Sequence, residues 1–427
     1  MPARSVLACL CSCLFSLLVA PDPLVEAEVR GQQFPRTSTG IHLEMVFNYL
    51  EPNPGAESGV VDVVWGSNYA TQPTGVYNSA YIPISVDNYT HSVAWYQKKH
   101  PDWLEYLCDR QTLAFEFGAT NLAPLDFANP EVQAYQWAEW VDAPLAQGFA
   151  GIAVDTMSLT NNWQRCGHYD GFGAWVQQYS GASQDARFRK DVLGWEGATY
   201  KHTHAYSSTA TMQVNVPYQF GQSAADNLKL MTTADLLFDE RGFTNYGGPP
   251  AYPSAGQWKT IVDVLKQVQS KGLCYMTNGE EPGASKDISQ AARLWVIANY
   301  LLVKNNCTYM YLSGIQDYGE LITFPEYSVT IGRSEGEMIK TQGVWLRKFS
   351  GGLALVNPYS RSRTVNLPAG NYVDVNGNPV GSTVDMAPES GVVLLKQCRD
   401  SHRVLVPYQN TAPLVMVGRW NVIRPFD

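Results

Sequence analysis

From about residue 40 onward, short apolar runs of strand length alternate with amphipathic segments of helical length. This alternation is typical of repeated βα units around a parallel sheet, and about eight such units close the sheet into a barrel. We expect the eight strands at residues 42–47, 60–65, 112–117, 151–155, 211–214, 234–243, 272–277 and 307–312. The pattern therefore predicts an α/β fold, a (β/α)₈ TIM barrel, over residues 40–340.

After about residue 341 the rhythm changes to short strands separated by turns, of which Asn376-Gly377 is the clearest turn signal. Residues 341–398 are therefore predicted to form a small C-terminal antiparallel β-sandwich domain. Residues 399–427 show no clear period, and we interpret them as a tail of unknown order.

The N-terminal segment contains Arg4 and an apolar run, 6–19, that is shorter than the ~20 residues that span a bilayer. We interpret residues 1–27 as a signal peptide, so the expected protein is secreted and has no membrane span. Sequons at Asn88 and Asn306 agree with glycosylation in that pathway. Three of the eight cysteines lie in the signal segment, and the odd remainder predicts one or two disulfides with a leftover thiol.

The acidic composition of the chain limits the classes of partner that it is expected to bind. The formal net charge is -9, and no run of Lys and Arg offers a phosphate-binding surface, so no nucleic-acid partner is expected. Aromatic residues make up 12% of the sequence, and their flat amphipathic faces suit sugar rings as well as an ordinary core.

Asp155 is the first candidate for a catalytic residue. It closes the apolar run 152–154, and a buried parallel strand that ends in a single carboxylate delivers an acid to the rim of a barrel. No basic residue adjoins Asp155 in the sequence, so a chemical role is favoured over a helix cap or an ion pair.

Glu240, on the sixth predicted strand, is the second catalytic candidate. Side chains alternate along a strand, so Asp239 and Glu240 point to opposite faces, and Asp235 lies too far from the C-terminal end. Two carboxylates at one rim can act as a nucleophile and a general acid or base, so Asp155 and Glu240 form a candidate catalytic pair. Asp239 stays open as the alternative acid, and Arg241 is a candidate for substrate binding or for pairing with either acid.

Four further residues lie at the ends of other predicted strands, face the same rim and are candidates for substrate binding: Asn48, Trp65, Asn215 and Asn278. The alternative is that they only terminate their strands. Asp126 precedes Asn129-Pro130, where we expect a helix to begin. Aspartate braces loops more often than it catalyses, so Asp126 is a site residue of second rank.

Four segments together carry a resemblance to a known family: Leu-Asp-Phe-Ala-Asn-Pro-Glu-Val at 125–132, Gly-Phe-Ala-Gly-Ile-Ala-Val-Asp at 148–155, Leu-Phe-Asp-Glu-Arg-Gly-Phe at 237–243 and Gly-Gly-Leu-Ala-Leu-Val-Asn-Pro at 351–358. The chain resembles the glycoside hydrolases grouped as glycoside hydrolase-like family fifteen over most of residues 40–397. The resemblance implies a barrel followed by a β-sandwich, as in many retaining glycosidases. It also implies that two carboxylates flank the scissile glycosidic bond, with Asp155 as nucleophile and Glu240 as acid/base, as in α-galactosidase-like barrels. Residues 196–208 depart from the smooth helix expected there.

The sequence thus predicts a secreted glycosidase that cleaves O-glycosidic bonds of an oligo- or polysaccharide, retaining configuration through a covalent intermediate and using no metal or cofactor. The alternative is a non-catalytic carbohydrate-binding barrel, which the sequence does not distinguish from an enzyme. A metal-dependent hydrolase is the third hypothesis, and it rests on His168, His202 and His204.

Overall fold

The structure, a computed structural model, describes residues 34–397 apart from 36–38, 52, 72–74, 88–89, 156, 217–223, 246–247 and 249–250. The signal segment, the sequon at Asn88, Cys398 and the tail lie outside the described residues. At the centre is an eight-stranded parallel sheet in the order β1 (Glu44–Val46), β2 (Val63–Ser67), β3 (Tyr77–Pro83), β6 (Gly151–Asp155), β9 (Thr211–Asn215), β10 (Leu236–Asp239), β11 (Cys274–Glu281) and β12 (Thr308–Gly314). The amide of Met310 donates to the carbonyl of His42 at 3.0 Å, and this contact between the first and last strands closes the ring. The predicted (β/α)₈ barrel is confirmed.

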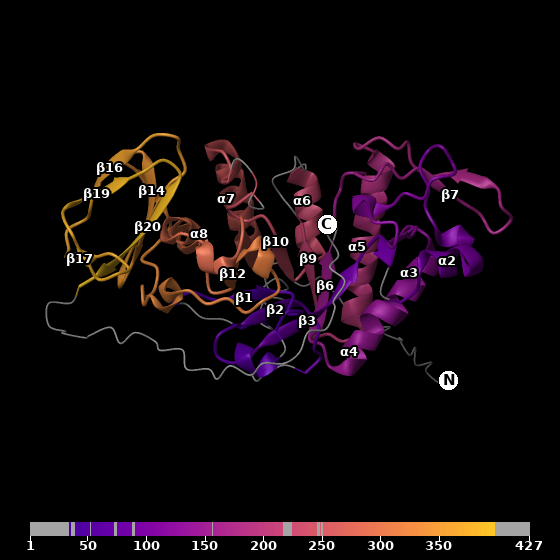
Figure 1. The fold of residues 1–427 in the computed structure, drawn as a ribbon, viewed down its shortest axis with the longest axis horizontal. Coiled ribbons are helices and arrows are strands. Elements are labelled where there is room, and N and C mark those ends of the chain that lie inside the picture. The colour runs from indigo at the N-terminus through magenta and orange to yellow at the C-terminus, as the bar shows by residue number, and fades with distance from the viewer. Residues whose placement is uncertain are drawn as a thin grey trace, which may run out of the picture.

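Helices cover the outside of this barrel (Figure 1): α3 (Pro130–Gln136), α4 (Ala143–Gln147), α5 (Ala186–Tyr206), α6 (Ala224–Thr232), α7 (Ala255–Ser270) and α8 (Gln290–Val303). Polar caps fix where several of them begin. Asn129 caps α3 ahead of Pro130, as predicted, and Ser254 forms a capping box with Gln257 at the start of α7. Among the described residues, no helix combines the length and the apolar character that a membrane span requires.

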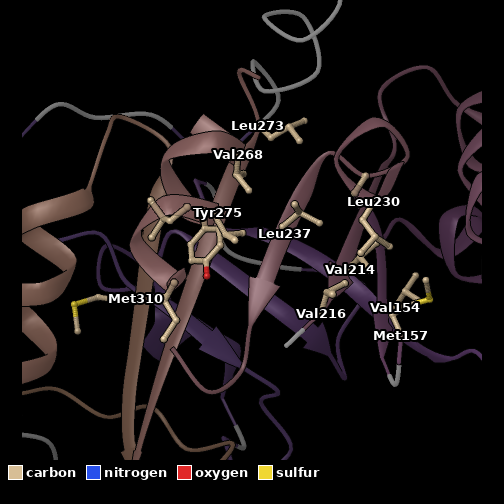
Figure 2. Packing of buried hydrophobic residues seen from close by; sticks show 14 of the residues in the cluster. Val154, Met157, Val214, Val216, Leu230, Leu237, Val268, Leu273, Tyr275 and Met310 are labelled. Atoms are coloured by element: carbon tan, nitrogen blue, oxygen red, sulfur yellow. The ribbon is translucent and has the colours of Figure 1, made fainter. Parts of the chain in front are cut away.

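Alternation of side chains along the strands produces two cores. The outward residues Val154, Val214 and Leu237 pack toward the helices, as Figure 2 shows. The inward residues Ala153 and Phe238 pack inside the barrel. The direction of a side chain at a strand end can therefore be read from its position in the strand.

The third barrel strand is not where we predicted it. Residues 112–117 lie in an insertion, where Leu113 bridges Tyr106 and the short 3-10 helix Glu116–Gly118 follows. The actual strand, β3, reads Tyr-Asn-Ser-Ala-Tyr-Ile-Pro and contains no apolar run. Asn78 and Ser79 are buried in it because both side chains find hydrogen-bond partners, Asn78 at the carbonyl of Tyr69 in the preceding loop and Ser79 at the carbonyl of Val64 in β2.

Residues 196–206 also differ from expectation, because they continue α5 to Tyr206 without a break. Glu196 is buried among the apolar residues of this helix, and polar residues at buried positions hide its helical period. His202 and His204 face different carboxylates, Asp142 at 2.7 Å and Asp235 at 3.0 Å. The two histidines therefore do not converge on one point. Within the described ranges, no group of three or more metal-ligating side chains occurs.

Two insertions form a lobe beside the C-terminal ends of β3 and β6, which we call the rim lobe and define as the described residues of 84–129 and 157–185. It contains the strand pair β4 (Val86–Asp87) and β5 (Ala123–Pro124), helix α2 (Val93–Lys99), and the hairpin of β7 (Gly167–Tyr169) and β8 (Trp175–Gln177). A disulfide between Cys108 and Cys166 joins the two insertions. A second disulfide, between Cys274 and Cys307, joins the starts of β11 and β12. Two disulfides agree with the prediction from the cysteine count.

A β-sandwich follows the barrel. Its larger sheet has six strands in the order β13 (Ile339–Thr341), β14 (Val344–Phe349), β15 (Gly352–Asn357), β20 (Ser390–Lys396), β17 (Tyr372–Val373) and β18 (Pro379–Val380), and β16 (Arg363–Asn366) pairs with β19 (Thr383–Met386). A separate apolar cluster that includes Leu355, Val365 and Met386 lies between the sheets. The predicted C-terminal antiparallel sandwich is confirmed.

The sandwich packs directly on α8, which it separates from solvent (Figure 1). Every residue of α8 from Trp295 to Val303 is buried, which explains why this part of the helix is apolar on nearly all sides. Arg347 of β14 reaches the end of the helix, where its Nη1 donates to the carbonyl oxygens of Leu301 at 3.2 Å, Leu302 at 3.2 Å and Lys304 at 2.6 Å. A cation from the sandwich therefore satisfies carbonyls that the helix itself leaves without donors.

We predict that Arg347→Met lowers the free energy of unfolding by about 1 to 3 kcal/mol, because the buried carbonyls of α8 lose their donor. Urea denaturation followed by circular dichroism measures this change. Lys348→Met is the matched control, since Lys348 is the exposed neighbour on the same strand. Equal midpoints for the two variants would contradict the capping role of Arg347.

Candidate active site

Asp155 ends β6 on the inward face of the barrel, two residues after the inward Ala153. Its side chain is half-buried and is held by two donors. The hydroxyl of Tyr81 donates to Oδ2 at 2.9 Å, and Nδ2 of Asn215 donates to Oδ1 at 2.9 Å. These bonds fix the carboxylate at the C-terminal rim, where the active sites of such barrels lie.

Glu240 follows β10 and lies beside Asp155. Its Oε2 accepts a hydrogen bond from Nδ2 of Asn215 at 2.9 Å, and its Oε1 accepts one from the hydroxyl of Tyr318 at 2.9 Å. The inward direction agrees with alternation, because Phe238, two residues earlier, also points into the barrel.

Asp239 points the other way. It is fully buried on the outward side, where the hydroxyl of Tyr275 donates to Oδ2 at 3.2 Å and the amide of Arg241 donates to Oδ1 at 3.2 Å. Burial raises the pKa of Asp239 to about 7. Its contacts connect it to the barrel wall, so Glu240 and not Asp239 shares a site with Asp155.

Asn215 connects the two carboxylates. One nitrogen, Nδ2, contacts Asp155 and Glu240 at 2.9 Å each, so the two accepting oxygens cannot be farther apart than twice that distance. Among the described residues its Oδ1 is buried and has no hydrogen-bond partner. Asn215, predicted as a substrate ligand, therefore has a defined place at the centre of the site.

Glu280 adds a third carboxyl group that the sequence interpretation missed. Strand β11 extends to Glu281, beyond the end predicted at residue 277, and Glu280 has the same inward parity as Met276 and Asn278. Burial and then the charge of Glu240 raise the pKa of Glu280 to about 8, although a hydrogen bond from Nδ2 of Asn278 at 3.1 Å acts against them. The alternation Asn278, Glu280 was the signal in the sequence that could have revealed it.

A ring cluster supports the two tyrosines that hold the carboxylates. The ring of Phe47 lies 5.3 Å from that of Tyr81 and 5.7 Å from that of Tyr318, centroid to centroid. Phe47 has a φ of 55°, an uncommon value for a residue with a side chain. Gly66 (φ 71°) leaves room for it, since a Cβ there would lie 2.8 Å from the Phe47 ring. Sequence reasoning did not find these tyrosines, because neither follows a strand in the predicted pattern.

Two predicted substrate ligands are corrected by burial. Trp65 is only 1% exposed and packs in the barrel against Phe238, with centroids 4.9 Å apart, so it cannot stack on a sugar. Asn48 is fully buried, and its amide bonds to Glu57 at 3.0 Å and to Ser67 at 3.2 Å. Both residues brace the strand ends, which was their plainer interpretation.

The remaining predicted ligands have other surroundings. Asn278 is buried and orients Glu280, so it does not face a sugar. Asp126 is buried in the rim lobe, where it accepts from Gln178 at 2.9 Å and pairs with His168 at 3.1 Å, and this corrects its assignment as a site residue. Arg241 is half-buried next to Glu240, and its role in substrate binding stays a prediction.

A closed parallel barrel whose strand ends bring carboxyl groups together at the C-terminal rim defines a TIM-barrel enzyme with an acidic site. The sequence model of the hypothetical glycosyl hydrolase family 15 matches residues 76–353, and the chain belongs to this family. The resemblance stated from the sequence is thereby confirmed, and membership of this family supports a glycosidase. A search of curated protein sequences found no match.

Solved structures with a similar course of the chain include a family GH13_31 enzyme, with 10% identity, a TM-score of 0.49, and coverage of 84% of this chain and 99% of that one. The α-amylase of Anoxybacillus matches with 11% identity and a TM-score of 0.45 over 84% of this chain and 97% of its own. The type III pullulan hydrolase of Thermococcus kodakarensis matches with 11% identity and a TM-score of 0.45 over 87% and 78%.

The raised pKa of Glu280 has a consequence for stability. Between the ordinary value of 4.5 and about 8, the folded protein holds a proton that the unfolded chain releases, so this group makes the protein less stable as the pH rises through that window. We predict that Glu280→Gln removes this loss and stabilises the protein relative to wild type at pH 9 but not at pH 4, by an amount on the order of a few kcal/mol.

Urea denaturation of both proteins from pH 4 to pH 9 checks this prediction. Glu139→Gln, at an exposed position, is the control and should run parallel to wild type. If the stability of Glu280→Gln also follows that of the wild type across this pH range, the Glu280 carboxyl is already ionised in the folded protein at neutral pH.

Proposed function

We propose that this glycosidase retains anomeric configuration, with Asp155 as the nucleophile and Glu240 as the general acid and base, on an oligo- or polysaccharide. The observation that carries the proposal is the shared hydrogen bond from Nδ2 of Asn215 to both carboxylates. It supports the proposal because two acids that share one donor line one small space, as a reaction at a single glycosidic carbon requires.

The separation of the carboxylates supports retention over inversion. Retaining enzymes hold their carboxyl groups about 5 to 5.5 Å apart, whereas inverting enzymes leave about 6.5 to 9.5 Å for a water molecule. Two carboxylate oxygens that each lie 2.9 Å from one nitrogen favour the shorter separation, which is that of retaining enzymes.

In this mechanism Glu240 donates a proton to the leaving oxygen while Asp155 attacks the anomeric carbon, and the bond between the sugar and its leaving group breaks. Water then attacks the glycosyl-enzyme, Glu240 takes a proton from that water, and Asp155 leaves as a carboxylate. Tyr81 and Tyr318 orient one carboxylate each.

We also propose that the protein is secreted after removal of residues 1–27. Two disulfides in the described part of the chain suit an oxidising compartment. Asn306 lies exposed in a turn before β12, where an oligosaccharyl group can be accommodated.

For the reaction, we predict that Asp155→Ala loses nearly all turnover of any active glycoside and regains part of it with azide, which enters the vacated space and attacks instead. Glu240→Gln should slow substrates with poor leaving groups by about 10²- to 10⁴-fold and spare activated aryl glycosides, because only the former need a proton. A screen of aryl glycosides and oligosaccharides supplies the substrate, and proton NMR of the first-formed anomer reports the stereochemistry.

Asp239→Asn is the matched control, since it changes the neighbouring carboxylate that faces away from the site. It should keep the dependence on leaving group of the wild type. An inverted first product would overturn the retaining mechanism, and binding without turnover of any glycoside would favour the carbohydrate-binding alternative.

For secretion, we predict that protein collected from the medium of a eukaryotic host begins near residue 28 and that Asn306→Gln and Asn88→Gln each reduce its mass by one glycan. N-terminal sequencing and intact-mass spectrometry check both points. A soluble intracellular product that retains Met1 would contradict the proposal.

A further inference from the structure

Phe117 and Trp163 form an aromatic pair on the surface of the rim lobe. Their ring centroids lie 4.6 Å apart with an angle of 58° between the planes. Phe117 is 51% exposed, and Trp163 is half-buried. The two residues come from the insertions that follow β3 and β6, and the second insertion begins directly after the Asp155 strand. The pair therefore belongs to the same end of the barrel as the candidate active site.

The backbone at this pair is held in an unfavourable conformation. Phe117 and Gln164 both have a φ of 54°, in the left-handed region that residues with side chains seldom adopt. Such conformations persist where the surrounding structure determines them, and they concentrate at ligand-binding sites. A large apolar ring that is exposed at a strained position is not explained by packing of the core.

A buried ion pair fixes the two strained segments to each other. Arg165, which follows Gln164, donates from Nη2 to Glu116, which precedes Phe117, at 2.8 Å. The side chains of this pair are 0% and 2% exposed. Arg165 also bonds to Glu105, and the neighbouring Cys166 is linked by its disulfide to the first insertion. Buried ion pairs contribute little net stability, so positional definition is the better account of this one.

We propose that Phe117 and Trp163 form a sugar-binding surface for a glycan segment outside the scissile bond, so that the substrate is a chain of several sugars. This inference rests on the proposed function, and it adds the class of substrate. Aromatic faces pack on the apolar faces of sugar rings, and the exposed amide side chains of Asn162 and Gln164 beside Trp163 offer donors and acceptors for hydroxyl groups. Preorganisation by the buried ion pair reduces the entropy that binding would otherwise cost.

Affinity electrophoresis tests the proposal. The protein from residue 28 to 427 carrying Asp155→Asn, which is expected to leave the polymer intact, is run in native gels that contain soluble starch, pullulan, xyloglucan or galactomannan. We expect at least one polymer to retard it, and Phe117→Ala and Trp163→Ala each to raise the dissociation constant by about tenfold. Phe117→Tyr, which keeps the ring, should restore binding.

Phe172→Ala is the matched control, because Phe172 is 100% exposed at the tip of the β7–β8 hairpin in the same lobe. It should leave the retardation unchanged, and equal melting temperatures show that all variants are folded. The proposal would be overturned if both alanine variants were retarded as strongly as the Asp155→Asn parent. It would also be overturned if no polymer retarded that parent.

The outcome separates this inference from the proposed function. If Phe117→Ala with Asp155 intact loses catalytic efficiency on the retarding polymer but keeps its rate on aryl glycosides, both stand. If no glycoside is hydrolysed yet the aromatic variants lose retardation, the surface stands without the mechanism. If hydrolysis is normal and the variants bind like the parent, only the surface is rejected.

Discussion

The fixed parity of side chains in a closed parallel barrel is the constraint on which the site depends. In a ring without edges, every second residue of each strand faces one common axis, and strands end together at the same rim. Asp155, Asn215 and Glu240 share the inward parity on three successive strands. A single amide nitrogen can therefore reach carboxylates from both neighbours, and a shift of β10 by one residue would turn Glu240 to the outer wall.

The same constraint means that the site lowers the stability of the folded protein. Two buried amide oxygens, on Asn215 and Asn278, lack partners among the described residues, and Glu280 is nearly buried with its charge opposed by the surroundings. Phe47 supports the tyrosines from a strained backbone. Stability given up at the rim is characteristic of sites that bind polar ligands, because the ligand supplies the missing partners. The apolar cores inside and outside the barrel compensate for it.

The fold and the two principal carboxylates were predictable because they depend on period and parity, which are local properties of the sequence. Asp155 ends an apolar run, and alternation alone selects Glu240 over Asp239. Trp65 and Asn48 were misjudged because a strand end shows the direction of a residue but not its depth below the rim. Tyr81 and Tyr318 reach the site through contacts between segments that are distant in the chain. Strand β3 was missed because its buried polar residues are satisfied only by tertiary hydrogen bonds.

The docking of the sandwich on α8 determines how this architecture can be rearranged in evolution. A helix that is buried from Trp295 to Val303 and ends on a guanidinium from the next domain cannot be left uncovered. Gly391 admits the close approach of β20, since a Cβ there would lie 2.3 Å from the carbonyl oxygen of Leu294. If a gene fusion joined this barrel to a different C-terminal domain, that domain would have to supply a cation in place of Arg347 and a residue without a side chain in place of Gly391. The barrel and the sandwich are therefore expected to be inherited together and not to be exchanged as separate domains.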